Sequence, residues 1–278
     1  MNGVPTEGRT SFDLVDQIYE DMDAETVTLT MRRAGAAVSS PSRDVVLERV
    51  FAGVPKPLGY KMSEVRADGT RVGYVQIRRF YSTELPYFRR ALSDLVDDQG
   101  ANALVLDLRG NTGGVFQGAL GSASLFLDDM VAMYAVDERT LDITPYRTAK
   151  GRVSVIPSIP VVIWVDGKSA SSSEIFTAAL RDNCRATVMG DRTYGKGLIQ
   201  AVVGLEDGGR LVVTVARYLT PDGRPIDGLG IEPDVPGKGI VPPGFVLGKR
   251  TDTSKVDFKE ASDRLKSICP ASDESQSQ

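Results

Sequence analysis

The sequence ALVLDLRGNTGG at residues 103–114 indicates the fold class of this chain. It begins as a nearly continuous apolar run, which is typical of a strand that is covered on both faces. It ends in a turn at Gly113 and Gly114, and small and apolar residues with helical character follow from about 116 to 126. A buried strand, a glycine turn and a helix in this order predict an α/β layered core.

The same alternation of strands and helices continues on both sides of this stretch. Strand patterns occupy 26–31, 45–47, 72–80, 160–165, 187–190, 198–203 and 211–215, and helical spacing marks 11–20, 88–96 and 174–180. The polar tail ends in residues 271–278, for which we expect disorder. The repeated pairing of strand and helix supports an α/β core rather than an all-β or all-α fold.

The composition excludes several functional classes. The chain has 278 residues, a net charge of −4, no histidine and two cysteines. This charge argues against a broad surface for nucleic acid, and no apolar stretch is long enough to span a bilayer. We expect no cofactor and no metal, because a zinc site without histidine would need mostly carboxylates. We expect Cys184 to pack in a helix, and a disulfide to Cys269 is the alternative.

Two short motifs indicate acyl-transfer chemistry. They read GKSASSSE at 167–174 and TYGKG at 193–197. Without histidine a Ser-His-Asp triad is impossible, so a lysine is the best remaining base. Ser171 stands between a predicted strand and a predicted helix, where free amides at the helix start can stabilise an oxyanion. The alternative is that these serines are only helix caps and turn formers.

Lys196 is the candidate base, and Gln200 is its candidate partner. On a regular strand these two residues project to the same side, and a neutral amide orients an amine without favouring the ammonium form. A lysine must fall from a pKa of about 10.4 to about 7–8 to act as a base near neutrality, and burial can supply that shift. The alternative is a surface lysine in a glycine loop.

Gly113 and Gly114 can present backbone amides to a carbonyl oxygen, although a plain tight turn is the alternative. A phosphate-binding loop is excluded because its lysine and Ser/Thr are absent. Asp107 and Arg109 flank Leu108, and we expect them to form a structural pair rather than a catalytic one. Two further acids, Glu174 and Asp182, form no carboxylate dyad and are set aside.

Taken together, these segments resemble the C-terminal processing peptidases, also called tail-specific proteases. The resemblance covers roughly 1–236, with motifs in family order at 73–77, 106–114, 168–176, 195–200, 218–223 and 228–234. It implies a crotonase/ClpP-like α/β core, with Ser171 as nucleophile, Lys196 as base 25 residues later, and Gln200 as its support. It also implies an oxyanion hole formed by the amide of Ser172 and a glycine amide at Gly113 or Gly114. Ser172 departs from the family pattern, in which alanine is usual, but only its backbone amide is needed.

The resemblance also divides the chain into segments. It implies a truncated PDZ domain at 1–33, a linker and cap segment at 34–71, the catalytic peptidase core at 72–236 and a C-terminal extension at 237–278. No targeting segment is visible, and the first residues read as a turn inside a folded domain. We therefore expect a fragment of a longer precursor that recognises C-terminal carboxylates poorly.

The expected function is a serine endopeptidase that cleaves protein or peptide substrates near accessible C-terminal tails. No nucleic-acid partner is expected, and the oligomeric state is left open. The resemblance implies a periplasmic or thylakoid-lumen location. Two alternatives stay open: a catalytically silent PDZ-core binding protein, and a crotonase-type enzyme acting on a thioester. The first is disfavoured because Ser171, Lys196 and Gln200 are all present, and the second because no basic cluster for coenzyme A is evident.

Overall fold

The computed structural model describes residues 26–32, 40–48, 58–81, 84–153, 155, 158–205, 209–237 and 252–269. The chain forms two compact units, Met1–Pro55 with Gly204–Leu211, and Lys56–Val203 with Val212–Gln278. In the first unit, β1 (Thr26–Met31) pairs antiparallel with β2 (Arg43–Glu48), which confirms both expected strands. The helix expected at 11–20, and most of the expected PDZ segment, lie outside the described residues.

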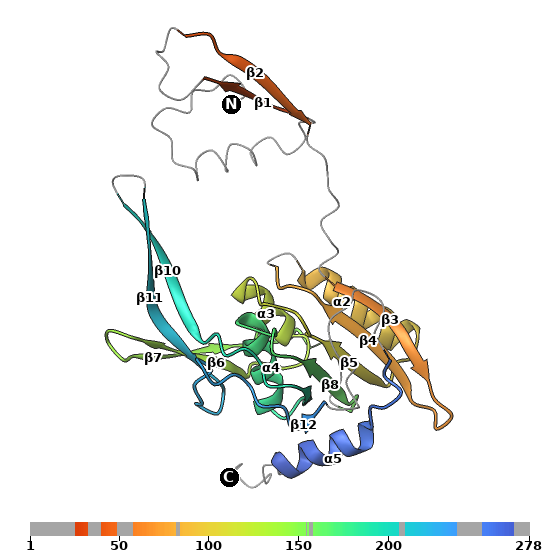
Figure 1. Ribbon diagram of the computed structural model, residues 1–278. Helices are drawn as coiled ribbons and strands as arrows, with labels where there is room; N and C mark the ends of the chain where they lie inside the picture. Colours follow the sequence, from red (N-terminus) through yellow and green to blue (C-terminus); the bar gives the residue numbers. More distant parts are fainter. Residues whose placement is uncertain are drawn as a thin grey trace. The chain divides into compact units, whose positions relative to one another are not determined.

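A six-stranded sheet organises the second unit (Figure 1). Its strand order is β12 (Val235–Pro236), β9 (Thr187–Gly190), β8 (Val161–Val165), β5 (Ala103–Asp107), β4 (Arg71–Ile77) and β3 (Leu58–Val65). Every neighbouring pair from β12 to β4 is parallel, and β3 runs antiparallel to β4 at the edge. Strands β5, β8 and β9 are buried at every position, as their apolar runs predict. The structure places β3 inside the range 34–71, which the sequence assigned to a linker and cap segment.

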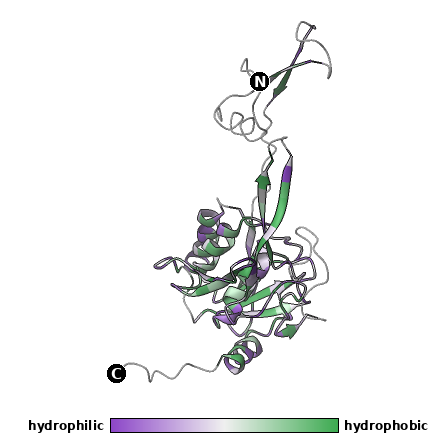
Figure 2. Ribbon diagram, turned by 90° about the vertical axis from the view of Figure 1, so that its left-hand side faces the viewer, coloured by the Kyte–Doolittle hydropathy of each residue, from purple (hydrophilic) through white to green (hydrophobic). Residues whose placement is uncertain are grey.

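Three helices cover one face of this sheet. They are α2 (Leu85–Ser93), which continues into the π-helical turn η1 (Asp94–Asp98), α3 (Phe116–Ala123) and α4 (Ser172–Asp182). Their apolar side chains, such as Phe88, Ala119 and Phe176, pack with alternate strand residues in one core. All three helices expected from the sequence in this region are therefore confirmed. Figure 2 shows the apolar residues as green ribbon on the strands inside this unit.

A fourth helix, α5 (Phe258–Ile268), covers the opposite face of the sheet (Figure 1). Asp257 caps it by accepting the amides of Lys259 and Glu260. Phe258 and Ala261 pack there with sheet residues that include Trp164. Helix α5 was not predicted, because only a narrow apolar stripe interrupts its polar surface. Among the described residues, no helix is long and apolar enough to cross a bilayer.

A second sheet has the order β10 (Leu198–Gly204), β11 (Arg210–Leu219), β6 (Val131–Asp137) and β7 (Ile143–Arg147). β10 and β11 confirm the strands expected at 198–203 and 211–215, while β6 and β7 were not anticipated. Ile175 on α4 packs against Met133 and Ala135 on β6. Helix α4, which begins directly after Ser171, therefore lies between the first sheet and strand β6.

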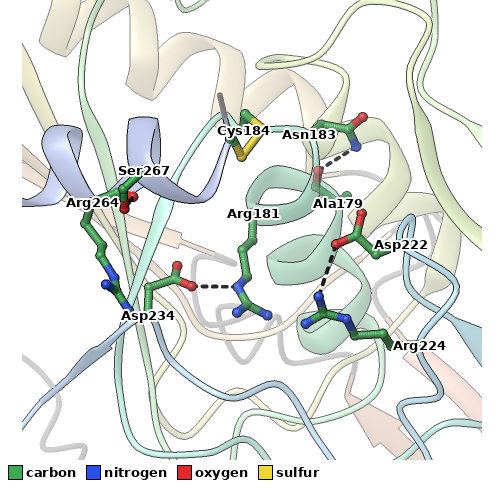
Figure 3. Close-up of a disulfide and its surroundings, with 10 residues drawn as sticks. Ala179, Arg181, Asn183, Cys184, Asp222, Arg224, Asp234, Arg264 and Ser267 are labelled. Carbon is green, nitrogen blue, oxygen red and sulfur yellow. Dashed lines mark hydrogen bonds and ion pairs between the residues drawn. A yellow bond between two sulfur atoms is a disulfide. The ribbon is translucent and has the colours of Figure 1, made fainter. Parts of the chain in front are cut away.

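A disulfide joins Cys184 to Cys269 (Figure 3). Cys184 lies in the turn after α4, with a φ of 58°, and Cys269 is the residue that ends α5. The expectation that Cys184 packs in a helix is therefore wrong, and the alternative pairing with Cys269 is the one observed. The sequence reading failed here because it missed α5, which brings the distant Cys269 to this turn.

Candidate active site

Ser171 stands at the junction of β8 and α4, half-buried and as the N-cap of the helix. Its φ of 56° and ψ of −119° lie in a region that residues with a side chain rarely adopt. Such a conformation costs of order 1–3 kcal/mol and persists only where the surroundings enforce it. Ser171 is therefore held in a sharp strand-to-helix turn, the geometry that exposes the nucleophile of many hydrolases.

The glycine turn after β5 (residues 108–114) holds the serine loop before α4 (residues 166–171) in place. The Ser169 hydroxyl donates to the Leu108 carbonyl oxygen at 2.8 Å. The Asn111 carbonyl oxygen accepts both the Ala170 amide at 3.0 Å and the Ser173 hydroxyl at 2.9 Å. These bonds join segments about sixty residues apart in sequence. The serine loop and the glycine turn therefore form one rigid unit.

Gly113 and Gly114 pack directly against this loop. A Cβ on Gly113 would lie 2.9 Å from the Ser171 Cβ, and a Cβ on Gly114 would lie 2.1 Å from the Phe80 carbonyl oxygen. Both glycines also have positive φ angles, 103° and 140°. No side chain fits at either position, so the turn requires two glycines.

The amides of Gly113 and Gly114 differ in whether they already donate a hydrogen bond. The Gly113 amide donates to the Asn111 side-chain oxygen at 2.9 Å. Within the described part of the chain, the amides of Gly114 and Ser172 have no hydrogen-bond acceptor. The Ser172 hydroxyl also donates to the Gly114 carbonyl oxygen at 3.0 Å, which ties the two segments together. The pair of free amides is therefore Gly114 and Ser172, and Gly113 supports them.

Glu174 connects the serine loop to the loop that carries Lys196 (residues 193–197), called the lysine loop below. Its side chain is fully buried, and its Oε2 accepts the amides of Ser171 at 2.8 Å and Lys196 at 2.9 Å. Its Oε1 accepts the Gly195 amide and the Thr193 hydroxyl, each at 2.6 Å. Sequence reasoning set Glu174 aside, although the Ser-x-x-Glu spacing is the signature of a capping box. One carboxylate thus positions both halves of the site.

The opposite side of the lysine loop packs against the segment 226–231. The Ile231 amide donates to the Thr193 hydroxyl at 2.6 Å, and the Gly228 amide donates to the Gly195 carbonyl oxygen at 2.9 Å. The Gly197 carbonyl oxygen accepts the Tyr218 amide at 2.7 Å. The backbone of the lysine loop is therefore fixed from two sides.

The Lys196 and Gln200 side chains are exposed. Among the described residues, no hydrogen bond joins the Lys196 amine to Ser171 or to Gln200. The expectation that burial desolvates this amine is therefore wrong for the arrangement seen here. The physical reason is that Glu174 binds Lys196 only through its backbone amide and leaves the Lys196 side chain in solvent.

Asp107 and Arg109 form a buried ion pair beside the glycine turn, with 2.6 Å between nitrogen and oxygen. Asp107 also accepts the Tyr74 hydroxyl at 2.5 Å, and the Arg109 guanidinium lies 4.8 Å from the Trp164 ring centre. Burial, reinforced by the nearby Asp107, raises the pKa of Tyr74. The expected structural pairing of Asp107 and Arg109 is confirmed, and it anchors the strand end that leads into the turn.

Asp182 lies at the end of α4 opposite Ser171. Burial raises the pKa of its carboxyl. In the described ranges, no three acidic or cysteine side chains gather in a way that could hold a metal ion.

Comparisons with known proteins show which family this chain resembles. Residues 71–236 match the sequence model of peptidase family S41. The chain is 34% identical over 264 residues to a carboxyl-terminal-processing protease of Synechocystis, covering 90% of this chain and 60% of that protein. It is 33% identical over 234 residues to the chloroplastic carboxyl-terminal-processing peptidase 1 of Arabidopsis thaliana, covering 84% and 46%. The chain thus spans about half the length of these curated relatives.

Among solved structures, the fold is similar to a photosystem II D1 C-terminal processing protease. The TM-score is 0.62 at 30% sequence identity, and the match covers 95% of this chain and 67% of that one. The α/β core expected from the sequence is therefore confirmed, while the N-terminal PDZ remnant is not shown.

Proposed function

The chain belongs to peptidase family S41, and we propose from this premise that it is a serine-type peptidase with Ser171 as nucleophile and Lys196 as base. The observation that carries the proposal is the setting of Ser171. Its strained backbone exposes the hydroxyl at the start of α4, next to the free amides of Ser172 and Gly114. Free amides at a helix start are suited to an oxygen that becomes negative in the transition state.

The proposed reaction follows from these positions. The Ser171 oxygen attacks the carbonyl carbon of the scissile peptide bond, and the neutral Lys196 amine accepts the serine proton. The carbonyl oxygen becomes an oxyanion that the amides of Ser172 and Gly114 stabilise. The lysine then returns the proton to the leaving amine, and water hydrolyses the acyl-enzyme by the same steps. Gln200 orients the amine, and a bound peptide shields it from water.

The proposed substrates are proteins with accessible C-terminal tails. Support comes from relatives that are named carboxyl-terminal-processing proteases. The proposed compartment is oxidising, either the bacterial periplasm or the thylakoid lumen. The Cys184–Cys269 disulfide favours such a compartment, because the cytosol keeps thiols reduced. A catalytically silent binding protein is the alternative, and turnover separates the two.

The test compares Ser171→Ala and Lys196→Ala with the wild-type chain on an unstructured peptide substrate. Each variant should lose at least about three orders of magnitude in rate, since members of a nucleophile–base pair act as a unit. Lys168→Ala is the matched control, because Lys168 is an exposed lysine in the same serine loop. Melting curves check that each variant is folded. A Lys196→Ala enzyme that keeps most of the rate would refute the dyad.

Recognition of the tail is tested with one peptide that carries either a free or an amidated C-terminus. Faster cleavage of the free form would support the proposed specificity for C-terminal tails, because capture of a terminal carboxylate needs its negative charge. Equal rates for the two forms would contradict recognition of the terminal carboxylate.

A further inference from the structure

Glu84 is a buried carboxylate that the proposed mechanism does not use. Its side chain, at the start of α2, belongs to a residue that is 1% exposed. It accepts the Tyr81 amide at 2.9 Å and the Ser122 hydroxyl on α3, also at 2.9 Å. In the part of the chain that the structure describes, these two donors are its hydrogen-bond partners, and neither is charged. In the described ranges, no lysine or arginine forms an ion pair with Glu84.

Glu84 lies directly behind the glycine turn of the candidate site. Tyr81, whose amide it holds, follows Phe80, and Phe80 forms a parallel bridge with Gly114. The Phe80 amide donates to the Gly113 carbonyl oxygen at 3.0 Å, and the Phe80 carbonyl oxygen accepts the Val115 amide at 2.9 Å. The segment 80–81 is therefore the backbone support of the turn that carries the Gly114 amide.

The other bond of Glu84 reaches α3, the helix that begins right after this turn. Gly118 on α3 packs so closely on Tyr81 that an added Cβ would lie 2.4 Å from the Tyr81 carbonyl oxygen. The Glu84 carboxylate thus holds the support segment through Tyr81 and the helix after the turn through Ser122.

We propose that Glu84 is a positioning residue whose ionised carboxylate holds the segment 80–81 against the turn at Gly113 and Gly114, and that its protonation loosens this turn. The inference rests on the proposed function and adds a proton-dependent control of the oxyanion hole. Burial raises the pKa of Glu84 to about 7, so the carboxyl changes its charge near neutrality. An ionised acceptor binds an N–H donor about twice as strongly as a neutral one, so protonation weakens both bonds.

The first experiment reads the turn without any need for activity. Nuclear magnetic resonance of the full chain labelled with ¹⁵N-glycine follows the amide signals of Gly113 and Gly114 against pH. In the wild type, both signals should shift with a midpoint near pH 7. In Glu84→Gln the step should disappear, because the amide accepts from Tyr81 and donates to Ser122 without titrating.

A second variant keeps the test decisive if Glu84→Gln folds poorly. Ser122→Ala removes a hydrogen bond that favours the ionised carboxylate, so the step should move to higher pH. The matched control is Glu138→Gln, which neutralises an exposed glutamate paired with Arg217 and should leave the step unchanged. A step that persists in Glu84→Gln, or that ignores Ser122→Ala, would overturn the inference.

The peptidase assay supplies the second readout. When the pH falls from 8 to 6, the fold decrease in kcat should be about ten times larger in the wild type than in Glu84→Gln. The reason is that only about one carboxyl in ten stays ionised one pH unit below its midpoint. Equal losses in the two proteins would overturn the inference. If the wild type shows no Ser171-dependent cleavage, the proposed function fails, and the resonance experiment still decides the role of Glu84.

Discussion

The serine side and the lysine side of the site are built in different ways. Around Ser171, the backbone and the neighbouring side chains are fixed by buried hydrogen bonds to Asn111, Leu108 and Glu174. Around Lys196, the backbone is equally fixed, but the side chain that we propose as the base is exposed. The fold thus fixes the surroundings of Ser171, and it leaves the amine of Lys196 in solvent.

Glu174 is the place where the two sides meet, and replacing it should have the largest effect on stability. Glu174→Gln puts an NH₂ group opposite N–H and O–H donors that now bond to a carboxylate oxygen. Breaking such a buried charged network costs about 3–5 kcal/mol of the free energy of unfolding. Urea unfolding measures this loss, and peptidase activity should fall with it.

The control is Glu260→Gln, which changes an exposed glutamate in the first turn of α5. It should alter the free energy of unfolding by less than about 0.5 kcal/mol. If Glu174→Gln changed the free energy of unfolding as little as this control, the serine side and the lysine side would not depend on one carboxylate.

The serine side should also contain a charge that lowers stability. The pKa of Glu84 is about 7 when folded, above its unfolded value, so the stability it contributes is present at low pH and is lost as pH rises through 7. Glu84→Gln removes this loss. The variant should therefore be more stable than the wild type by up to about 3 kcal/mol at pH 8, and equally stable at pH 4.

Urea unfolding at both pH values measures this difference. The same pH dependence in wild type and Glu84→Gln would show that ionisation of Glu84 does not lower the free energy of unfolding. The serine side would then be held in place with no loss of stability.

The strained backbone of Ser171 gives a smaller and sharper test. Ser171→Gly should be more stable than Ser171→Ala by about 1 kcal/mol, because glycine adopts a φ of 56° without steric cost. At Ser173, inside the same helix, the order should reverse, since glycine is the poorer helix former. Thermal unfolding of the four variants measures these differences in stability. If the alanine variant were the more stable at both positions, the backbone of Ser171 would not be strained.

The lysine side should respond weakly to charge. Gln200→Glu puts a carboxylate at the position that we propose orients the Lys196 amine, which should favour the ammonium form and move the rising limb of the pH–rate profile to higher pH. Both side chains are exposed, so the move should be less than about one pH unit and should shrink in high salt. Gln200→Met is the neutral control, and an unmoved limb in the glutamate variant would remove Gln200 from the site.

Strands β4, β5, β8 and β9, the helices of the core and the place of Ser171 were predictable, because each depends on local patterns of apolar residues and glycine. Strands β3, β6 and β7 were not predicted. Three further features were not predictable. The four bonds of Glu174 depend on loops that meet only in the fold, and the exposure of Lys196 depends on which part of its loop those bonds hold. The disulfide depends on α5, a helix whose narrow apolar stripe hides it in a polar tail.

The disulfide has a topological consequence for the proposed peptidase. It closes residues 184–269 into a covalent ring that contains Lys196 but not Ser171. A single cut anywhere inside this ring leaves both pieces attached through sulfur, so Lys196 stays linked to the part of the chain that carries Ser171. Only reduction of the bond would separate them. The ring therefore protects the pairing of Ser171 and Lys196 against one backbone cut between 185 and 268.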